Sequence, residues 1–197
     1  MTASLPSVPL LRPVLRRHLL HLRHGDTVLR PLQRVDLPIW RRFHERVRRL
    51  QCHPHDPAGE DRFLASVQRS RLQHADDRLL LGVFEQQQDR LIGQLSVQLE
   101  CIHAQRAQLD WPCRALLMDA IQLRSAMLAL CRFLFEQVGL HRVCLLLPPA
   151  GHDHLREALL AAGFRREGVL RGHHRAPDGW QDRCLYAQTA PDWPPAA

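Results

Sequence analysis

The sequence predicts an α/β fold in which helices flank a single mixed, mostly antiparallel sheet. Three observations predict it. Strand-like and helix-like segments alternate along the whole chain. The run "RVCLLLPP" (142–149) is continuously apolar, which is typical of a strand buried on both faces. Polar turn sequences separate two pairs of strand-like segments, as in antiparallel hairpins.

The first elements are short strands followed by two helices. Two extended pieces lie on either side of a turn at His24–Gly25–Asp26. Asp36 is expected to cap a helix from Leu37 to about Leu50, with a proline acceptable in its first turn. After the loop "HPHDPAGED", a second helix of about a dozen residues is expected from Asp61.

Three strands and the principal helix follow. "RLLLGVFEQ" (78–86) and "RLIGQLSVQLEC" (90–101) form a hairpin, and Gly93 suggests a bulge or a close backbone approach. The next strand, "AQRAQLDWPC", stops at Pro112 because proline offers no amide to a ladder. The segment 119–137 has helical apolar spacing.

The last part of the chain completes the sheet. The apolar strand 142–149 is followed by a short helix that Gly163 closes at its C-terminal cap. The remaining segment, 165–188, is predicted to fold back as a hairpin around Pro177–Asp178–Gly179. The predicted order is β-α-α-β-β-β-α-β-α-β-β.

Length and composition indicate one domain. The chain has 197 residues, of which 45% are hydrophobic, which is enough for a single core. We expect an N-terminal extension at 1–23, the domain at 24–190 and a tail at 191–197. No apolar run approaches the roughly 20 residues of a membrane span, and prolines interrupt the N-terminus. The six cysteines form no CxxC pair, so we expect reduced thiols in a cytoplasmic protein.

The positive charge does not by itself indicate nucleic acid. All 27 basic residues are arginine and the net charge is +7, but the arginines are spread over every segment. One cluster stands out, in the first helix, and such a cluster is usually a solvated helix face. Its members are Arg41, Arg42, Arg46, Arg48 and Arg49. We expect no nucleic-acid binding.

Four stretches carry a resemblance to a known family. They are "GDTVLRPLQRVDL", "DRLIGQLSV", "FLFEQVGLHRV" and "LLAAGFRREGVLRGHHRAPDGWQDRCLY". Together they resemble the GNAT acetyltransferase superfamily, and the last stretch is similar to the branch that acetylates ribosomal-protein N-termini. The resemblance covers residues 24–188. It implies a GNAT fold with splayed fourth and fifth strands, acetyl-CoA as the acyl donor, and a peptide or small-molecule amine as acceptor. A homodimer is left open.

The pyrophosphate turn of this family, Q/R-x-x-G-x-G/A, falls on residues 116–121 by counting back from Gly139-Leu140-His141. Leu116, Asp119 and Ile121 then replace all three signature residues. Asp119 has two readings: a carboxylate facing the pyrophosphate, repelling it by about 4 kcal/mol, or a helix N-cap pointing aside. Candidate cofactor-binding residues are Trp111, Cys113, Asp119, Ala120, Ile121 and Arg124.

The family's Asn-x-x-Ser motif at the start of the next helix is also changed, with His152 and Leu155 in its place. His152 could donate a hydrogen bond or act as an acid near neutral pH. Asp110, at the end of the fourth strand, is the best-placed base, with Glu100 next. Trp40 and Arg171 are candidates for the acceptor side.

Three histidine-rich clusters, "CHPHD", "GHDH" and His173-His174, lack the paired spacing of a zinc site, so we expect no metal. The leading hypothesis is therefore acyl transfer from acyl-CoA to a primary amine. Two alternatives remain open: a non-catalytic GNAT-fold protein that binds a peptide or partner, and a basic, RNA- or ribosome-associated member of the superfamily. Fold analogy alone does not separate them.

Overall fold

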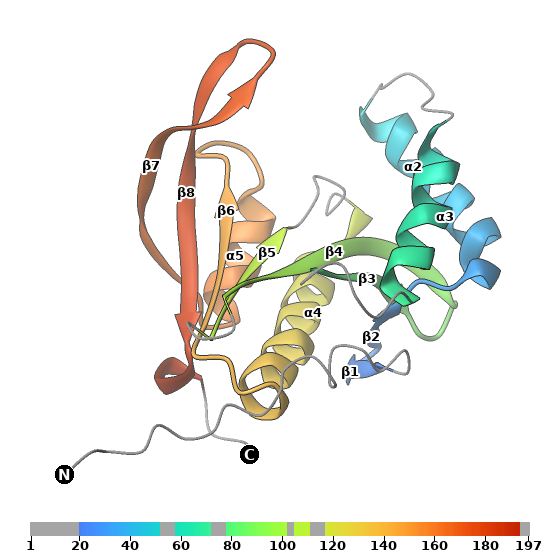
Figure 1. Ribbon diagram of the computed structural model, residues 1–197, viewed down its shortest axis with the longest axis horizontal. Helices are drawn as coiled ribbons and strands as arrows, with labels where there is room; N and C mark the ends of the chain where they lie inside the picture. The colour runs from blue at the N-terminus through green and yellow to red at the C-terminus, as the bar shows by residue number, and fades with distance from the viewer. Residues whose placement is uncertain (1–19, 52–57, 72–77, 102–104, 111–116, 194–197) are drawn as a thin grey trace.

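The computed structural model describes residues 20–51, 58–71, 78–101, 105–110 and 117–193. They form one eight-stranded sheet in the order β1-β2-β3-β4-β5-β6-β8-β7 (Figure 1). The strands are β1 (Leu22–His24), β2 (Thr27–Pro31), β3 (Arg78–Glu85), β4 (Arg90–Cys101), β5 (Arg106–Asp110), β6 (Arg142–Leu147), β7 (Arg165–Ala176) and β8 (Gly179–Thr189). Neighbouring strands are antiparallel except β5 and β6, which run parallel.

The helices follow the predicted order. They are α2 (Leu37–Gln51), α3 (Ala58–Arg71), α4 (Ala120–Arg132) and α5 (Asp153–Ala161), with short 3-10 turns at Arg34–Asp36 and Ala190–Asp192. The predicted helix 119–137 is confirmed, but its last five residues, Phe133–Gln137, widen into a π-helical turn. Both predicted hairpin turns are present.

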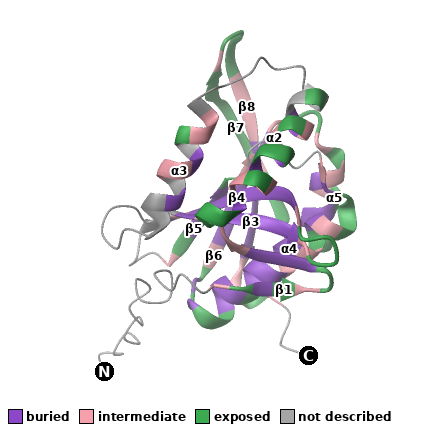
Figure 2. Ribbon diagram, turned by 90° about the vertical axis from the view of Figure 1, so that its right-hand side faces the viewer, coloured by how far each residue is buried: buried purple, intermediate pink, exposed green. Residues whose placement is uncertain are grey.

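Two apolar layers hold the helices to opposite faces of the sheet (Figure 2). The larger cluster joins the strands to α4 and α5 through residues such as Met127, Leu130 and Leu159. The smaller cluster packs Trp40 and Phe43 of α2, and residues of α3, against the β2–β3–β4 part of the sheet. Each buried Leu, Met or Phe contributes about 1.5–3 kcal/mol through apolar burial. α2 and α3 cover only part of this face of the sheet, the part formed by β2, β3 and β4 (Figure 1).

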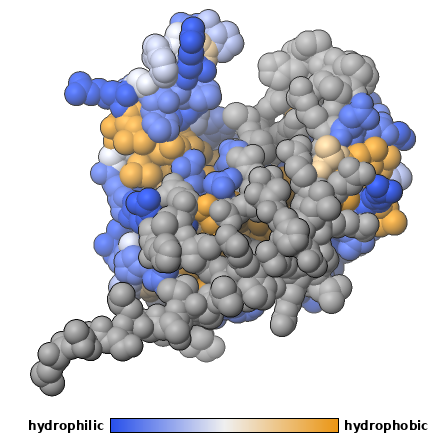
Figure 3. All heavy atoms as spheres, in the orientation of Figure 1, coloured by the Kyte–Doolittle hydropathy of each residue, from blue (hydrophilic) through white to orange (hydrophobic). Residues whose placement is uncertain are grey.

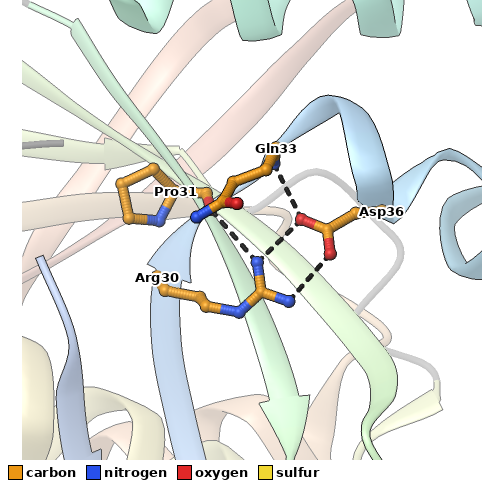
Figure 4. A network of polar contacts seen from close by, with 4 residues as sticks. All are labelled: Arg30, Pro31, Gln33 and Asp36. Atoms are coloured by element: carbon orange, nitrogen blue, oxygen red, sulfur yellow. Dashed lines mark hydrogen bonds and ion pairs between the residues drawn. The ribbon is translucent and has the colours of Figure 1, made fainter. Parts of the chain in front are cut away.

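A buried carboxylate fixes the entry into α2, although not in the way that the sequence predicts. Asp36 was expected to cap α2, but it lies in a 3-10 turn that continues directly into the helix. Its carboxylate therefore turns back, accepting from the Gln33 amide at 2.7 Å and from both terminal nitrogens of Arg30 at 2.7 and 2.8 Å (Figure 4). The Arg30 guanidinium also lies 3.8 Å from the ring centroid of Phe84.

Gly93 confirms the predicted close approach. A Cβ at this position would lie 2.5 Å from Cε of Met118, the buried residue that precedes the start of α4. The β3–β4 register shifts beside it, between Val83 and Phe84. Because Gly93 has no side chain, Met118 can lie directly on the sheet and hold the beginning of α4 against it.

The β7–β8 hairpin extends well beyond the rest of the sheet (Figure 1). Its register shifts between Leu170 and His174, and the N–H of Gly172 in this bulge donates to Asp182 at 2.8 Å. Val169 and Leu170 are partly exposed on β7, and Figure 3 shows a hydrophobic area on this side of the molecule.

Cys131, Cys144 and Cys184 are buried and are not in disulfides, as predicted for reduced cysteines at those three positions. Among the described residues, no helix is both long and apolar enough to span a membrane.

Candidate functional site

The parallel strands β5 and β6 separate part-way along their length. They are paired from Arg106 with Arg142 to Leu109 with Leu145, and the pairing then ends. Among the described residues, β6 pairs beyond Leu145 only with β8, through Leu146 and Leu147. Asp110, the next residue of β5, has no partner on β6 among the described residues, which fits the predicted splay of the two strands.

Asp119 is the N-cap of α4, as one reading of this residue predicts, and its effect on a bound anion stays a prediction. Its Oδ1 accepts from the Gln122 amide at 2.8 Å, and its own amide donates to Gln122 Oε1 at 3.1 Å. This capping box satisfies one free amide of the first turn. The Gln122 side chain also donates to Glu85 at 3.2 Å, which ties the cap to the end of β3.

The capping box does not use the backbone amides of the first two residues of α4. Ala120 and Ile121 occupy the first two helical positions, whose N–H groups have no acceptor inside a helix. Both residues are exposed, and 78% of the Ile121 surface is accessible. The start of α4 thus offers two backbone donors to an anion, but the Asp119 carboxylate lies beside them.

Arg124 lies one turn further along α4, and its Nε donates to the carbonyl of Ala161 at 3.2 Å. That carbonyl is at the C-terminal end of α5, where a positive charge interacts favourably with the helix dipole. The structure therefore gives Arg124 a contact that joins the two helices, and its predicted role with the cofactor stays a prediction.

His152 begins α5 in a left-handed conformation, with φ of 61°. Burial lowers the pKa of this imidazole, and the nearby positive groups of His154, Arg156 and Arg183 lower it further against a smaller opposing effect of Asp153. Arg156 is itself engaged with Asp153 at 2.5 Å and with the Gly151 carbonyl. His152 is therefore a neutral imidazole at pH 7.

Arg183, on β8, adds an unused donor near this histidine. Its Nη1 is fully enclosed and has no hydrogen-bond partner among the described residues. A buried guanidinium nitrogen without a partner is costly.

Asp110 ends β5 on the face of the sheet that carries α2 and α3. It is exposed and lies directly opposite Ser96 of β4. Ser96 and Gln94 share this face with Asp110, and both are buried, with 5% and 7% of their surfaces accessible. Sequence reasoning missed these two residues. The strict alternation of polar and apolar residues in "GQLSVQLE" could have indicated them, but such alternation usually marks a solvated face.

The other predicted site residues lie apart from these. Trp40 is a core residue of the smaller cluster, stacked at 4.8 Å between ring centroids on Phe63, so its role on the acceptor side stays a prediction. Arg171 is exposed in the bulge of β7. Trp111, Cys113 and the side chain of Glu100 lie outside the described part of the structure. No group of three or more potential metal ligands occurs in the described part of the chain.

No protein-family model and no curated protein matches the sequence. Solved structures do. RimJ of Mycobacterium smegmatis, solved with CoA-disulfide, is 21% identical, with a TM-score of 0.71 over 89% of this chain and 88% of that one. The ribosomal-protein-S5-alanine acetyltransferase of Vibrio fischeri is 17% identical, with a TM-score of 0.67 over 89% and 100% of the two chains.

A GNAT-family acetyltransferase of Bacillus anthracis gives a TM-score of 0.68 at 15% identity, over 87% and 99% of the chains. At such identities the similarity concerns the fold. The strand order, the parallel β5–β6 pair that separates, and these structural neighbours agree with one another. The chain has the GNAT acetyltransferase fold, with one mixed sheet that opens between β5 and β6.

Proposed function

We propose that this protein is an N-acyltransferase that transfers an acetyl or other acyl group from acyl-CoA to a primary amine. The observation that carries the proposal is the opening between β5 and β6 beyond Leu109 and Leu145, in a GNAT fold. The acceptor is a protein N-terminus or a small amine. Free buried thiols such as Cys131 suit a reducing compartment that contains acyl-CoA, the cytoplasm.

The residues that would bind the donor fit the extended arm of acyl-CoA better than they fit its phosphates. The free edge of β6 at Leu146 and Leu147 supplies backbone groups for an extended, amide-bearing arm. The amides of Ala120 and Ile121 would hold phosphate oxygens at the start of α4. The Asp119 carboxylate weakens that contact by like-charge repulsion, although it is drawn toward the Gln122 amide that it caps.

Acyl-CoA supplies an activated thioester, and the protein's own residues supply proton transfer. Asp110 is the base that would take a proton from the acceptor's ammonium, because it is exposed at the end of β5 beside the opening. The second proton that the attacking amine loses would pass to the departing thiolate, and His152, whose lowered pKa favours the neutral imidazole at pH 7, would donate an N–H hydrogen bond to that sulfur. Its lowered pKa makes the imidazolium a minor species at this pH.

The second candidate function is non-catalytic binding by a GNAT-fold protein. The observation that favours it is again the start of α4, where a carboxylate and an exposed isoleucine, Ile121, stand in place of glycines. In this alternative the open sheet face would bind a peptide without any donor.

The two functions are separated by measuring CoA release from acetyl-CoA in the presence of peptides with free N-terminal alanine or serine. Transfer, seen as a mass increase of one acetyl group on the peptide, supports the enzyme. Asp110→Asn should reduce the rate by about 10²–10⁴-fold, the usual contribution of a general base, without changing acetyl-CoA affinity. Absence of transfer to any free amine by folded protein would favour the binding function.

A further inference from the structure

The face of the sheet between α2–α3 and the β7–β8 hairpin carries polar side chains that the core does not use. Ser96 lies opposite Leu80 on one side and opposite Asp110 on the other, and Gln94 lies opposite Gly82. Residues directly opposite each other in an antiparallel pair point to the same face. Leu80 packs against the cluster of α2 and α3, so Gln94, Ser96 and Asp110 all belong to that face.

These side chains have no polar partner in the part of the chain that the structure describes. No hydrogen bond or ion pair involves the side chain of Gln94, Ser96 or Asp110 among the described residues, although the first two are more than nine-tenths buried. The fully enclosed side-chain atoms without partners belong to other residues, Glu85, Arg90, Arg183 and Gln188. The polar atoms of Gln94 and Ser96 therefore still reach an accessible space, and a buried polar group of this kind is costly unless a ligand or water satisfies it.

The spacing of the three residues suits one small group. Opposite residues have Cβ atoms about 4.5–5.5 Å apart, which applies to Ser96 and Asp110. Gln94 is two residues along β4, about 7 Å from Ser96. Side chains of these lengths can bring a carbonyl oxygen, a hydroxyl and a carboxylate to a common point between the strands.

We propose that Gln94, Ser96 and Asp110 form the binding site for the protonated primary amine of the acceptor. An ammonium has three N–H donors and no acceptor, so it matches three oxygens, one of them charged. The carboxylate distinguishes the ammonium from a neutral amide, and Gln94 and Ser96 direct its remaining hydrogens. This inference rests on the proposed function and adds to it the residues and the charge state that select the acceptor.

Placement relative to the opening supports this assignment. Asp110 is the last residue of β5, immediately beyond Leu109, where the pairing with β6 ends. In Figure 1 α2 and α3 stand on the β3–β4 side, and the hairpin rises on the far side of β6. An amine held at Asp110 would thus lie beside the gap in which the proposed thioester is held, ready to lose its proton to the same carboxylate.

The test uses the full-length protein labelled with ¹⁵N and a probe of defined charge. The probe is the tripeptide Ala-Ala-Ala-amide, with its N-acetylated form as the uncharged control. Titration at pH 6.5 should shift the amide resonances of residues 94–96 and 108–110 with the free peptide and not with the acetylated one. At pH 9.5, where an N-terminal amine with a pKa near 8 is largely neutral, the affinity should fall by about thirtyfold.

Ser96→Ala and Gln94→Met should each weaken binding of the free peptide by about ten- to a hundredfold, as expected for a lost hydrogen bond to a charged group. Ser125→Ala, a matched change in α4, should leave it unaltered. The spectra themselves report whether each variant is folded. Unchanged affinity in both site variants, equal binding of the acetylated peptide, or shifts confined to other residues would overturn the inference.

A parallel titration with acetyl-CoA separates this inference from the proposed function. If the free peptide binds at Gln94 and Ser96 while acetyl-CoA does not bind, the amine site stands and the acyltransferase proposal fails. If acetyl-CoA binds and acyl transfer occurs with unchanged peptide affinity in both variants, the acyltransferase stands and the assignment of Gln94 and Ser96 is wrong.

Discussion

At the scale of single residues, His152 shows how local backbone geometry selects a side chain. Its φ of 61° lies in the left-handed region, which β-carbon sterics disfavour and which Asn, Asp and His tolerate better than most residues. The resemblance to GNAT proteins places an asparagine at this position. An asparagine would suit the left-handed conformation and could also cap α5, whereas His152 makes no side-chain cap.

His152→Gly should therefore stabilise the protein by about 1 kcal/mol, because glycine adopts positive φ without the Cβ penalty. The free energy of unfolding in urea measures this effect. His154→Gly is the matched control: two residues further on, inside α5, the same change should destabilise by about 1 kcal/mol. Destabilisation by both substitutions would show that the His152 side chain contributes more than its backbone conformation costs.

The histidines also predict how stability depends on pH. The pKa values of His24 and His152 are both lowered, with burial as the largest cause and nearby arginines adding to it. The folded state therefore binds these protons less readily than the unfolded state, in which the pKa is about 6.5. Their contribution is complete above pH 6.5 and is lost as the pH falls through the folded-state pKa values.

We expect the free energy of unfolding to decrease between pH 7.5 and 5.5, and the decrease to be smaller in the double variant His24→Gln, His152→Gln. Urea unfolding at a series of pH values measures both slopes. Equal slopes in the two proteins would assign the pH dependence to other groups.

At the scale of elements, the packing of Met118 on Gly93 fixes the start of α4 on the sheet. Gly93→Ala should destabilise by about 1–3 kcal/mol, since a new methyl group would overlap Met118 Cε at 2.5 Å. Met118→Ala alone should also destabilise, by about 2–5 kcal/mol, through the cavity that it leaves.

The double variant should be more stable than the sum of the two single effects predicts, by about 1 kcal/mol or more, because each change relieves the other. Gly168→Ala on β7 is the control, with no atom within 4 Å of its added Cβ. Strict additivity of the two costs would contradict the contact between Met118 and Gly93.

Substitutions of Asp119, the N-cap of α4, can separate its contribution to helix stability from the effect of its negative charge on anion binding. Asp119→Asn keeps a capping side chain and removes the negative charge, whereas Asp119→Ala removes both. The alanine variant should lose about 1 kcal/mol of stability, and the asparagine variant only a few tenths. If phosphate binds at Ala120 and Ile121, the asparagine variant should bind acetyl-CoA several-fold more tightly, as calorimetry would show. Unchanged affinity would place the phosphates elsewhere.

At the scale of the whole molecule, the sequence was sufficient for the order of elements. Hydrophobic periodicity located α4 and the buried strand β6, and turn residues located both hairpins. Local pattern was not sufficient for what depends on tertiary contacts. It assigned Asp36 to a helix cap because it could not show that Arg30, on the neighbouring strand, would pair with that carboxylate.

The candidate site, too, could be predicted from the sequence only in part. The carboxylate at the end of β5 was predicted from its position in the fold, and the structure places it at the point where the strands separate. Gln94 and Ser96 were not predicted, because alternation along β4 does not show which polar face becomes buried. Their burial is a property of the folded chain, which no local pattern along β4 encodes.

The central claim is that the opening between β5 and β6 binds acyl-CoA. Titration calorimetry of the full-length protein with acetyl-CoA tests it most directly, because binding is required whatever the acceptor is. We expect saturable one-to-one binding, which the Asp119→Asn substitution should not weaken. Folded protein that shows no binding heat at any of several temperatures, and no protection from thermal unfolding by acetyl-CoA, would contradict the claim.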